Sequence, residues 1–262
     1  MRQVLVTGAA SGLGWAMAQV FFRRGDALWL VDRDAGLLAE RVQTLAGGAR
    51  VQARVLDLTD AGAVAAFAQD FLATQPRLDV LVNNAGITHR SPAIHTRINV
   101  LERVMAVDYH AAVQLTLGLY PALEAARGTV VNIGSMAGWM PVPGRAAYCA
   151  AKGALTQFFE VFRAEVAARG VRVLMVYPSF LDTPIEQNAL GADGGQARHA
   201  RSTVGRIASA EGMAARIVTA LERGEERLFP DRFSAFAALL YRLCPRLFLR
   251  LVRHRFAGEL PA

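Results

Sequence analysis

The stretch that decides the fold is Thr7-Gly8-Ala9-Ala10-Ser11-Gly12-Leu13-Gly14, which joins an apolar strand-like run to a helical pattern. Glycines in such a turn allow a sharp change of direction, a close approach of pyrophosphate to the backbone, and close packing of the helix on the strand. The free N–H groups at the start of the helix also attract an anion. A glycine-rich turn without a ligand is the alternative, but this context favours dinucleotide binding.

The second predicted strand supports this interpretation, because Asp32 follows it directly. A carboxylate at that place can bind both hydroxyls of an adenosine ribose. Its charge would repel a 2′-phosphate, which favours NAD as the cofactor. The adjacent Arg33 could pair with such a phosphate, so NADP is the alternative cofactor.

Apolar strand-like runs alternate with longer helical patterns along most of the chain. Most of the runs are continuous, as expected for parallel strands that are buried on both faces. This alternation predicts an α/β fold with a doubly wound parallel sheet in one domain, over residues 1–230. The expected strands are Gln3–Thr7, Ala27–Val31, Val51–Leu56, Val80–Asn83, Thr129–Gly134 and Val171–Tyr177, with a short seventh at Arg227–Phe229. The expected helices include Leu13–Arg24, Ala61–Thr74, Leu101–Ala125 and Ala146–Arg169.

Two segments depart from this alternation of strands and helices. Asp182–Ser209 is rich in Gly, Ala and polar residues and lacks a clear strand, and a loop this long is usually functional or mobile. Residues 231–262 are predicted to form a C-terminal extension of amphipathic helices, which Pro245 divides into two. Apolar side chains follow one helical face, at Leu239, Leu240, Leu243, Leu247, Phe248, Leu251 and Val252, and another side carries Arg242, Arg246, Arg250 and Arg253.

The arginines and Pro245 make this extension a poor transmembrane span. It could lie flat in a membrane interface, with its apolar face towards the lipid and its arginines on phosphates. Packing on a partner subunit, or over the mouth of the active site, is the equally favoured alternative.

The composition limits the class of protein. The chain has 262 residues, 53% of them hydrophobic, which is ample for a buried core. The formal net charge is +7, but the arginines are spread along the chain, so we expect no nucleic-acid partner. Two cysteines and the absence of a signal-like segment favour the cytoplasm. Only one of the 29 basic residues is a lysine, Lys152, which suggests chemistry that a guanidinium cannot supply.

That lysine belongs to the stretch Tyr148-Cys149-Ala150-Ala151-Lys152, which lies in a helical pattern. Residues at i and i+4 share one face of a helix, so the phenol and the ammonium can point into one site. A nearby ammonium lowers the pKa of a phenol, which makes Tyr148 a usable proton donor and acceptor. Ser135 follows a buried strand, where its hydroxyl can bond a substrate oxygen. The alternative is an amphipathic helix face with an exposed cation.

In combination these motifs resemble the short-chain dehydrogenase/reductase family, from about Gln3 to about Arg223. The resemblance rests on Thr7–Gly14, Asp57, Asn83-Asn84-Ala85-Gly86, Ser135 and Tyr148-x-x-x-Lys152. It implies a Rossmann fold and an NAD(P)-dependent oxidoreductase that interconverts a secondary alcohol and a ketone. Tyr148 would be the catalytic acid/base, Lys152 would hold the nicotinamide ribose, and Ser135 would orient the carbonyl.

The resemblance also assigns the cofactor contacts. Asp57 would bind the adenine, and Thr183 would contact the nicotinamide amide. The implied cofactor-binding residues are Gly8, Ser11, Gly12, Leu13, Gly14, Asp32, Arg33, Asp57, Leu58, Asn84, Ala85, Gly86, Tyr148, Lys152, Pro178, Leu181 and Thr183.

The chain departs from the family at two places. The family commonly has an asparagine where this sequence has Asp108, which we include in the catalytic set. Asp108 can serve if the role runs through its backbone carbonyl, and its carboxylate could raise the pKa of Lys152. Pro178-Ser179 replaces the usual Pro-Gly, which removes a permissive backbone position beside the nicotinamide.

The stretch after Ser135 predicts an apolar substrate wall, with Trp139 and Met140 beside Ser135 and Tyr148. It resembles the hydroxysteroid- and lipid-oriented members of the family, so we expect a steroid- or lipid-like substrate. His89 is expected at the rim, and no metal site is expected. A homodimer or homotetramer is expected, with peripheral contact to the inner face of a membrane as a further prediction. The alternatives are a non-catalytic dinucleotide-binding sensor and a peripheral membrane scaffold.

Overall fold

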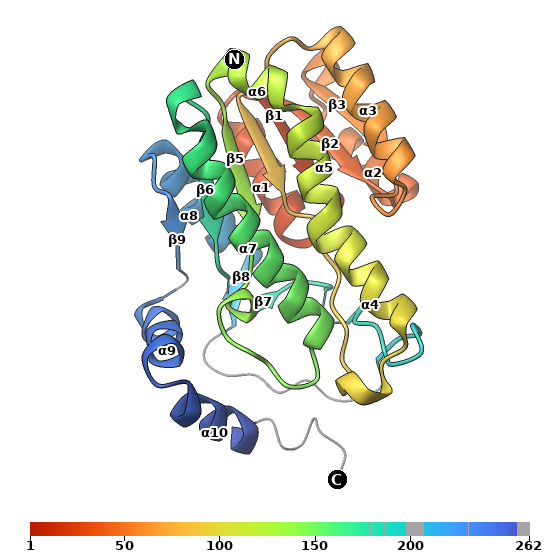
Figure 1. The fold of residues 1–262 in the computed structure, drawn as a ribbon. Helices are drawn as coiled ribbons and strands as arrows, with labels where there is room; N and C mark the ends of the chain where they lie inside the picture. Colours follow the sequence, from red (N-terminus) through yellow and green to blue (C-terminus); the bar gives the residue numbers. More distant parts are fainter. Residues whose placement is uncertain (179, 186, 198–206, 230, 256–262) are drawn as a thin grey trace.

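The computed structural model describes residues 1–178, 180–185, 187–197, 207–229 and 231–255, which form a sheet with helices on both faces (Figure 1). The sheet is parallel and has seven strands in the order β3-β2-β1-β4-β5-β6-β9. These strands are β1 (Gln3–Thr7), β2 (Ala27–Asp32), β3 (Val51–Val55), β4 (Val80–Asn83), β5 (Thr129–Ile133), β6 (Arg172–Val176) and β9 (Arg227–Leu228). The prediction of a doubly wound α/β fold in one domain is confirmed, including the short seventh strand.

The order of the strands reverses between β1 and β4. The chain winds outward from β1 to β2 and β3, and then from β4 to β5, β6 and β9 on the other side. The connections after β1 and β4 therefore diverge at the carboxyl edge of the sheet, which is where folds of this kind bind ligands. Residues in β4 and β5 are all buried, which explains the continuous apolar runs in the sequence.

Two layers of helices cover the sheet. One face is covered by α1 (Gly12–Arg23), α2 (Ala35–Leu45) and α8 (Ala210–Glu222), and its core includes Met17, Phe21 and Ile217. The other face is covered by α3 (Ala61–Thr74), α5 (Ala111–Gly118), α6 (Tyr120–Ala126) and α7 (Ala146–Val166). Each core consists of buried aliphatic and aromatic side chains, so the sheet edge, and not the sheet face, is free to bind ligands.

The single helix predicted for Leu101–Ala125 is interrupted. The segment comprises α4 (Ile98–Met105), a π-helical turn at Ala106–His110, α5 and α6. Pro121 lies in the first turn of α6, where its missing N–H does not break a helical hydrogen bond. The π turn matters more for the site than Pro121 does, because it contains Asp108, whose side chain is buried.

Of the two irregular segments, the first contains more structure than the sequence predicts. Asp182–Ser209 was expected to lack a strand, yet β7 (Leu181–Asp182) pairs in parallel with β8 (Ala208–Ser209) across its two ends. Pairs of two residues are too short to leave a pattern in the sequence. In the C-terminal extension, α9 (Arg232–Leu243) and α10 (Pro245–Arg255) confirm the division at Pro245. Both helices lie at the end of the molecule remote from the N-terminus (Figure 1).

Candidate active site

The glycine turn after β1 has the geometry that a dinucleotide requires. Gly8 and Gly12 adopt positive φ angles of 64° and 52°, a region that side chains with a Cβ rarely enter. A Cβ at Gly14 would overlap the carbonyl oxygen of Gly8. The side chain of Ser11 makes no capping hydrogen bond, so it does not occupy the N–H groups at the start of α1. The three glycines thus leave a cradle of backbone that a Cβ would fill.

This turn is tied to the end of β4 through Asn84 and Thr7. The side-chain amide of Asn84 donates to the carbonyls of Thr7 at 2.9 Å and Gly8 at 3.2 Å. The Thr7 hydroxyl accepts the N–H groups of Asn84 and Ala85, each at 3.0 Å. A Cβ at Gly8 would lie 2.9 Å from the Cα of Ala85. Two groups of predicted cofactor residues, Gly8–Gly14 and Asn84–Gly86, therefore meet at the carboxyl ends of β1 and β4.

Asp32, which is predicted to bind the adenosine ribose, is held against the glycine turn by a hydrogen bond. One of its carboxylate oxygens accepts the N–H of Ala10 at 2.9 Å, and the other accepts the N–H of Asp34 at 3.1 Å. Asp32 is half-buried, whereas Arg33 is exposed. A second cation also lies here, because Nε of Arg41 donates to the carbonyl of Ala10 at 3.1 Å. Sequence reasoning missed Arg41, since it lies on α2 and approaches the turn only in the folded chain.

Asp57 and Leu58 follow β3 at the same edge of the sheet. The Asp57 carboxylate accepts both the N–H and the hydroxyl of Thr59 at 2.9 Å. These hydrogen bonds hold the pKa of Asp57 below its ordinary value. Leu58 packs on the core, whereas Asp57 is exposed. The side chain of Asp57 is therefore accessible to the adenine that the resemblance assigns to it.

Lys152 is buried, with 4% of its surface exposed, in the second turn of α7. Its ammonium donates to the carbonyl of Ile133 at 3.0 Å and pairs with the Asp108 carboxylate at 3.1 Å. It lies 5.7 Å from the centre of the Tyr148 ring. A buried, hydrogen-bonded cation beside a phenol contradicts the alternative of a helix face with an exposed cation.

Asp108 approaches Lys152 from the π turn between α4 and α5. Its second oxygen accepts the N–H of Ile87 at 2.8 Å, in the loop after β4. Burial raises the pKa of Asp108, while the charge of Lys152 and the Ile87 N–H act in the opposite direction. The structure therefore brings together Asp108, Lys152 and Tyr148, as the sequence predicts.

Ser135 lies immediately after β5 and begins a short 3₁₀ turn, Met136–Gly138. Its hydroxyl oxygen accepts the N–H of Ala137 at 3.1 Å. A Cβ at Gly138 would lie 2.7 Å from the carbonyl oxygen of Lys152, so this turn packs closely on α7. The Ser135 segment is thereby fixed against the helix that carries Tyr148.

The residues predicted to contact the nicotinamide follow β6. Pro178 is buried, and its carbonyl accepts the N–H of Met136 at 3.3 Å. Thr183 lies against the glycine turn, because a Cβ at Gly12 would be 3.2 Å from its Cβ. Leu181 accepts the N–H of Thr183 at 3.1 Å. Of these residues Thr183 is the one shown to lie against the glycine turn, while Ser179 lies outside the described residues.

The apolar surroundings of Tyr148 differ from those that the sequence suggests. Tyr148 packs on a cluster of Val104, Ala147 and Ala151, which other elements extend with Ile87, Leu101, Met105, Tyr109 and Leu190. Trp139 instead packs edge-on against Tyr177, with ring centres 5.4 Å apart, and Met140 also packs on that core. The substrate contacts of Trp139 and Met140 stay predictions, and sequence reasoning missed the cluster because its members are far apart in the chain.

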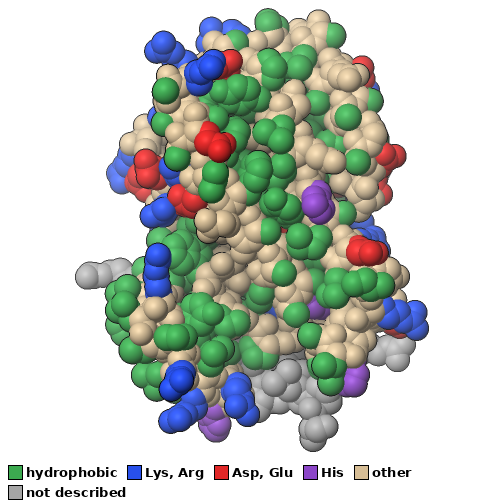
Figure 2. Space-filling model, viewed as in Figure 1, with side chains coloured by type: hydrophobic (Ala, Val, Ile, Leu, Met, Phe, Trp, Pro, Cys, Tyr) green, Lys and Arg blue, Asp and Glu red, His purple; other side chains and the backbone are tan. Residues whose placement is uncertain are grey.

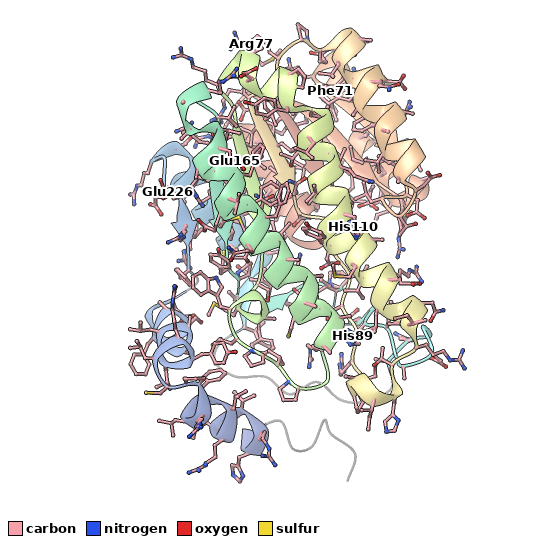
Figure 3. All side chains as sticks on the ribbon, viewed as in Figure 1. Phe71, Arg77, His89, His110, Glu165 and Glu226 are labelled. Carbon is pink, nitrogen blue, oxygen red and sulfur yellow. The ribbon has the colours of Figure 1, made fainter. Side chains whose placement is uncertain are left out.

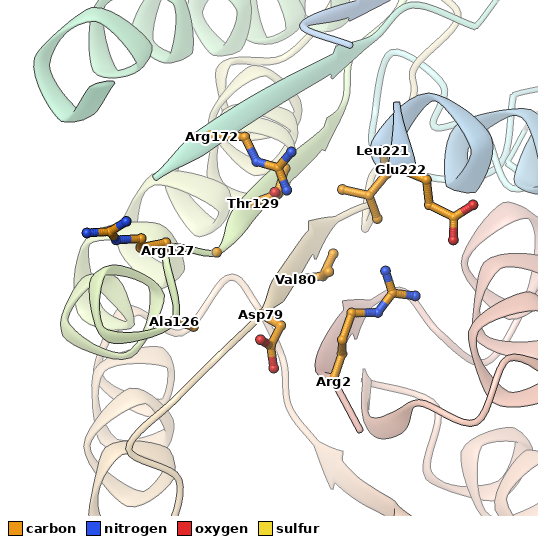
Figure 4. A pocket seen from close by; sticks show the side chains of 10 residues that line it. Arg2, Asp79, Val80, Ala126, Arg127, Thr129, Arg172, Leu221 and Glu222 are labelled. Carbon is orange, nitrogen blue, oxygen red and sulfur yellow. The ribbon is translucent and has the colours of Figure 1, made fainter. Parts of the chain in front are cut away.

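A separate cleft of about 310 Å³ lies at the opposite, amino edge of the sheet (Figure 4). Its lining includes Arg2, Asp79, Arg127, Arg172 and Glu222, none of which is a predicted site residue. Within the described ranges, no group of three or more His, Cys, Asp or Glu could hold a metal ion. The residues predicted for catalysis therefore lie away from this cleft.

Comparison with known proteins identifies the family. The family model for short chain dehydrogenases matches residues 2–193. The chain is 37% identical over 265 residues to dehydrogenase/reductase SDR family member 7B of Bos taurus, covering 98% of this chain and 82% of the relative. It is 33% identical over 262 residues to SDR family protein 7-like of Drosophila melanogaster, covering 97% and 80%.

Similar solved structures belong to the same family as these relatives. A short-chain dehydrogenase from Streptomyces avermitilis has a TM-score of 0.79 and 29% identity, covering 98% of this chain and 97% of the other. A metagenomic short-chain oxidoreductase in complex with NADP has a TM-score of 0.70 and 29% identity, covering 88% and 97%. The chain belongs to the short-chain dehydrogenase family and is an NAD(P)-dependent oxidoreductase that acts on CH–OH groups.

His89, expected at the rim, is fully buried beside the start of α7 (Figure 3). Neither ring nitrogen has a hydrogen-bond partner. Burial, aided by the charge of Arg145, lowers the pKa of His89 from 6.5 to about 4. The imidazole is therefore neutral throughout the physiological range.

This burial predicts that stability falls as pH falls. Between pH 6.5 and pH 4 the unfolded chain binds a proton at His89 and the folded chain does not, so the contribution is complete above pH 6.5. The free energy of unfolding should lose about 2 kcal/mol between pH 8 and pH 5 through this group. Urea unfolding at both values measures it. His89→Leu should lose that pH dependence, and replacing the exposed His110 by Leu should not. An unchanged slope in His89→Leu would contradict the assignment.

Proposed function

We propose that the chain interconverts a secondary alcohol and a ketone on an apolar, steroid- or lipid-like substrate, with Tyr148 as the acid/base. The observation that carries the proposal is the buried ammonium of Lys152, 5.7 Å from the Tyr148 ring at the carboxyl edge of the sheet. The apolar cluster around Tyr148 supports the substrate class, because apolar ligands bind in apolar, concave sites.

The residues present fit a nicotinamide dinucleotide. The backbone at Gly8, Gly12 and Gly14 would hold the pyrophosphate, Asp32 the adenosine ribose, and Thr183 the nicotinamide amide. When bound, the dinucleotide supplies the hydride donor or acceptor. NAD is the preferred cofactor in this proposal because of the charge of Asp32, and Arg33 and Arg41 make NADP the alternative.

The protein's own groups move the proton. The Tyr148 hydroxyl donates a proton to the carbonyl oxygen in reduction and removes it from the alcohol in oxidation. The positive charge of Lys152 favours the phenolate and so lowers the pKa of the phenol. The hydroxyl of Ser135 uses its oxygen to accept the Ala137 N–H and keeps its hydrogen for the substrate oxygen.

A dinucleotide-binding sensor without chemistry is the alternative function. Such a protein has no need of a buried ion pair, which costs desolvation free energy and often contributes little net stability. The pair of Lys152 with Asp108 therefore favours the enzyme over the sensor.

A second proposal concerns the C-terminal extension. Helices α9 and α10 leave several large apolar side chains exposed: Phe236, Leu239, Leu243, Leu247, Leu249 and Leu251. Figure 2 shows apolar side chains gathered over these two helices, with basic side chains at their outer end. None of the helices in the described ranges is long and apolar enough to cross a bilayer. We propose that this surface lies on an anionic membrane, with a second copy of the chain as the alternative occupant.

Tyr148→Phe should abolish turnover and leave dinucleotide binding nearly intact, because the phenol moves the proton whereas the glycine turn binds the cofactor. Turnover is measured with secondary alcohols and ketones by cofactor absorbance, and binding by NADH fluorescence titration. Tyr120→Phe, which alters a tyrosine that bonds Glu124, is the matched control. Near-normal turnover in Tyr148→Phe would remove the mechanism.

Asp32→Asn should shift kcat/KM from NAD towards NADP by at least about tenfold, because one negative charge beside the ribose is lost. Asparagine keeps an acceptor for the Ala10 N–H and loses the one for the Asp34 N–H, so the contact of position 32 with the glycine turn is preserved. Adding Arg41→Ala should reduce the gain, since Arg41 lies beside the same turn. A strong preference for NADP in the parent protein would overturn the assignment.

Replacing Leu243 and Leu247 together by Ser should weaken binding to vesicles with about one-third anionic phospholipid by tenfold or more, because each leucine contributes roughly 1–2 kcal/mol on burial. Both are exposed, at 70% and 48%, so the fold should survive. Leu117→Ser, at 52% exposure on α5, is the matched control. Equal vesicle sedimentation of parent and variant would exclude membrane contact, and a change in oligomer size on gel filtration would favour the second copy.

A further inference from the structure

The Asp108 carboxylate uses both of its oxygens inside the site. One oxygen accepts the N–H of Ile87 at 2.8 Å, and the other lies 3.1 Å from the ammonium of Lys152. An amide of the same shape offers one acceptor and one NH₂ donor. Whichever way an asparagine turned, its NH₂ would face either the Ile87 N–H or the ammonium. The two donors therefore select a carboxylate at position 108.

The ion pair is shut off from solvent. Asp108 is 1% exposed and Lys152 is 4% exposed. The loop after β4 closes over them at Gly86, where a Cβ would lie 3.2 Å from the Asp108 carboxylate and 3.5 Å from the Lys152 ammonium. In such surroundings charges interact strongly, and removing one partner leaves the other buried and uncompensated.

The groups around the Lys152 ammonium come from four elements. The π turn contributes the Asp108 carboxylate, and β5 contributes the Ile133 carbonyl. The loop after β4 contributes Gly86 and the Ile87 N–H, and α7 itself contributes the Tyr148 ring. The ionisable side chains among these groups are those of Asp108 and Tyr148.

We propose that Asp108 is a positioning residue that stabilises the charged form of Lys152 and thereby sets the pH at which Tyr148 works. The proposal rests on the proposed role of Tyr148. The negative charge of Asp108 opposes the loss of a proton from either neighbour, the ammonium or the phenol. Removal of that charge lowers the pH at which the coupled pair loses its first proton, whichever group loses it.

The single lysine of the chain makes this directly measurable. Protein grown with ¹³Cε-labelled lysine gives one side-chain NMR signal, that of Lys152. The midpoint of this signal in the parent protein serves as the reference for each variant. In Asp108→Asn its midpoint should fall by about one pH unit or more, because the ammonium has lost its counter-ion. Coincident titrations of the parent and Asp108→Asn would overturn the proposal.

A matched control exists at the other edge of the sheet. Asp26 is also a buried carboxylate, 4% exposed, and it accepts two hydrogen bonds from Arg2. Asp26→Asn should leave the Lys152 signal unchanged, and an equal shift would overturn the proposal. Asp108→Ser, which keeps one acceptor for the Ile87 N–H, serves if Asp108→Asn fails to fold. Thermal unfolding confirms that each variant is folded.

The second readout is the pH profile of alcohol oxidation with NAD. The acid limb of kcat should move about one pH unit lower in Asp108→Asn and should not move in Asp26→Asn. If the lysine signal shifts in Asp108→Asn but the acid limb of kcat does not, the charge of Asp108 does not affect the ionisation of Tyr148. That result would overturn the catalytic part of the proposal. The lysine signal needs no turnover. Full activity of Tyr148→Phe would therefore refute the proposed function and leave the test of the ion pair intact.

Discussion

A buried ammonium ion organises the carboxyl edge of this sheet. Lys152 needs acceptors and a counter-charge, because an isolated buried cation is strongly destabilising. The Ile133 carbonyl and the Asp108 carboxylate supply them. Because these groups come from β5 and from the turn between α4 and α5, the ion pair fixes α7 to both. The carboxylate reaches a third element through the Ile87 N–H, so the end of β4 is held in the same network.

The π turn is the local device that makes this network possible. A regular α-helix across Leu101–Ala125 keeps every residue on its helical face, whereas the π turn at Ala106–His110 carries one extra residue per turn. Asp108 lies in this turn, and its side chain is buried against Lys152. Gly86 completes the arrangement, since any side chain there would press on the ion pair. The same loop begins with Asn84, which braces the glycine turn, so the acid/base site and the cofactor site share one short connection.

The sequence predicts those parts of the site that depend on short-range pattern. The glycine turn, Tyr148 with Lys152 at helical spacing, and the strands with continuous apolar runs all have local signatures. The break in the predicted helix Leu101–Ala125 has no such signature, because tertiary contacts of Asp108 outweigh helix propensity there. Arg41 and the cluster around Tyr148 also escape prediction, since their neighbours in space are remote in the chain. His89 illustrates the same limit, because a polar residue in a loop is expected at the surface and only the fold shows its burial.

The contrast between Lys152 and the arginines follows from the same geometry. The chain uses arginine for every other basic residue, including the stripe Arg242, Arg246, Arg250 and Arg253 on α9 and α10. At an exposed surface a planar guanidinium that binds phosphate through several donors is suited to lipid headgroups. At position 152 the cation lies 3.0 Å from the Ile133 carbonyl and 3.1 Å from the Asp108 carboxylate. Gly86 packs over both groups so closely that a methyl group there would crowd them. A compact ammonium ion fits between those groups, whereas the broader guanidinium would displace Gly86 or Asp108. The lysine is therefore required by the volume of the site as much as by its charge.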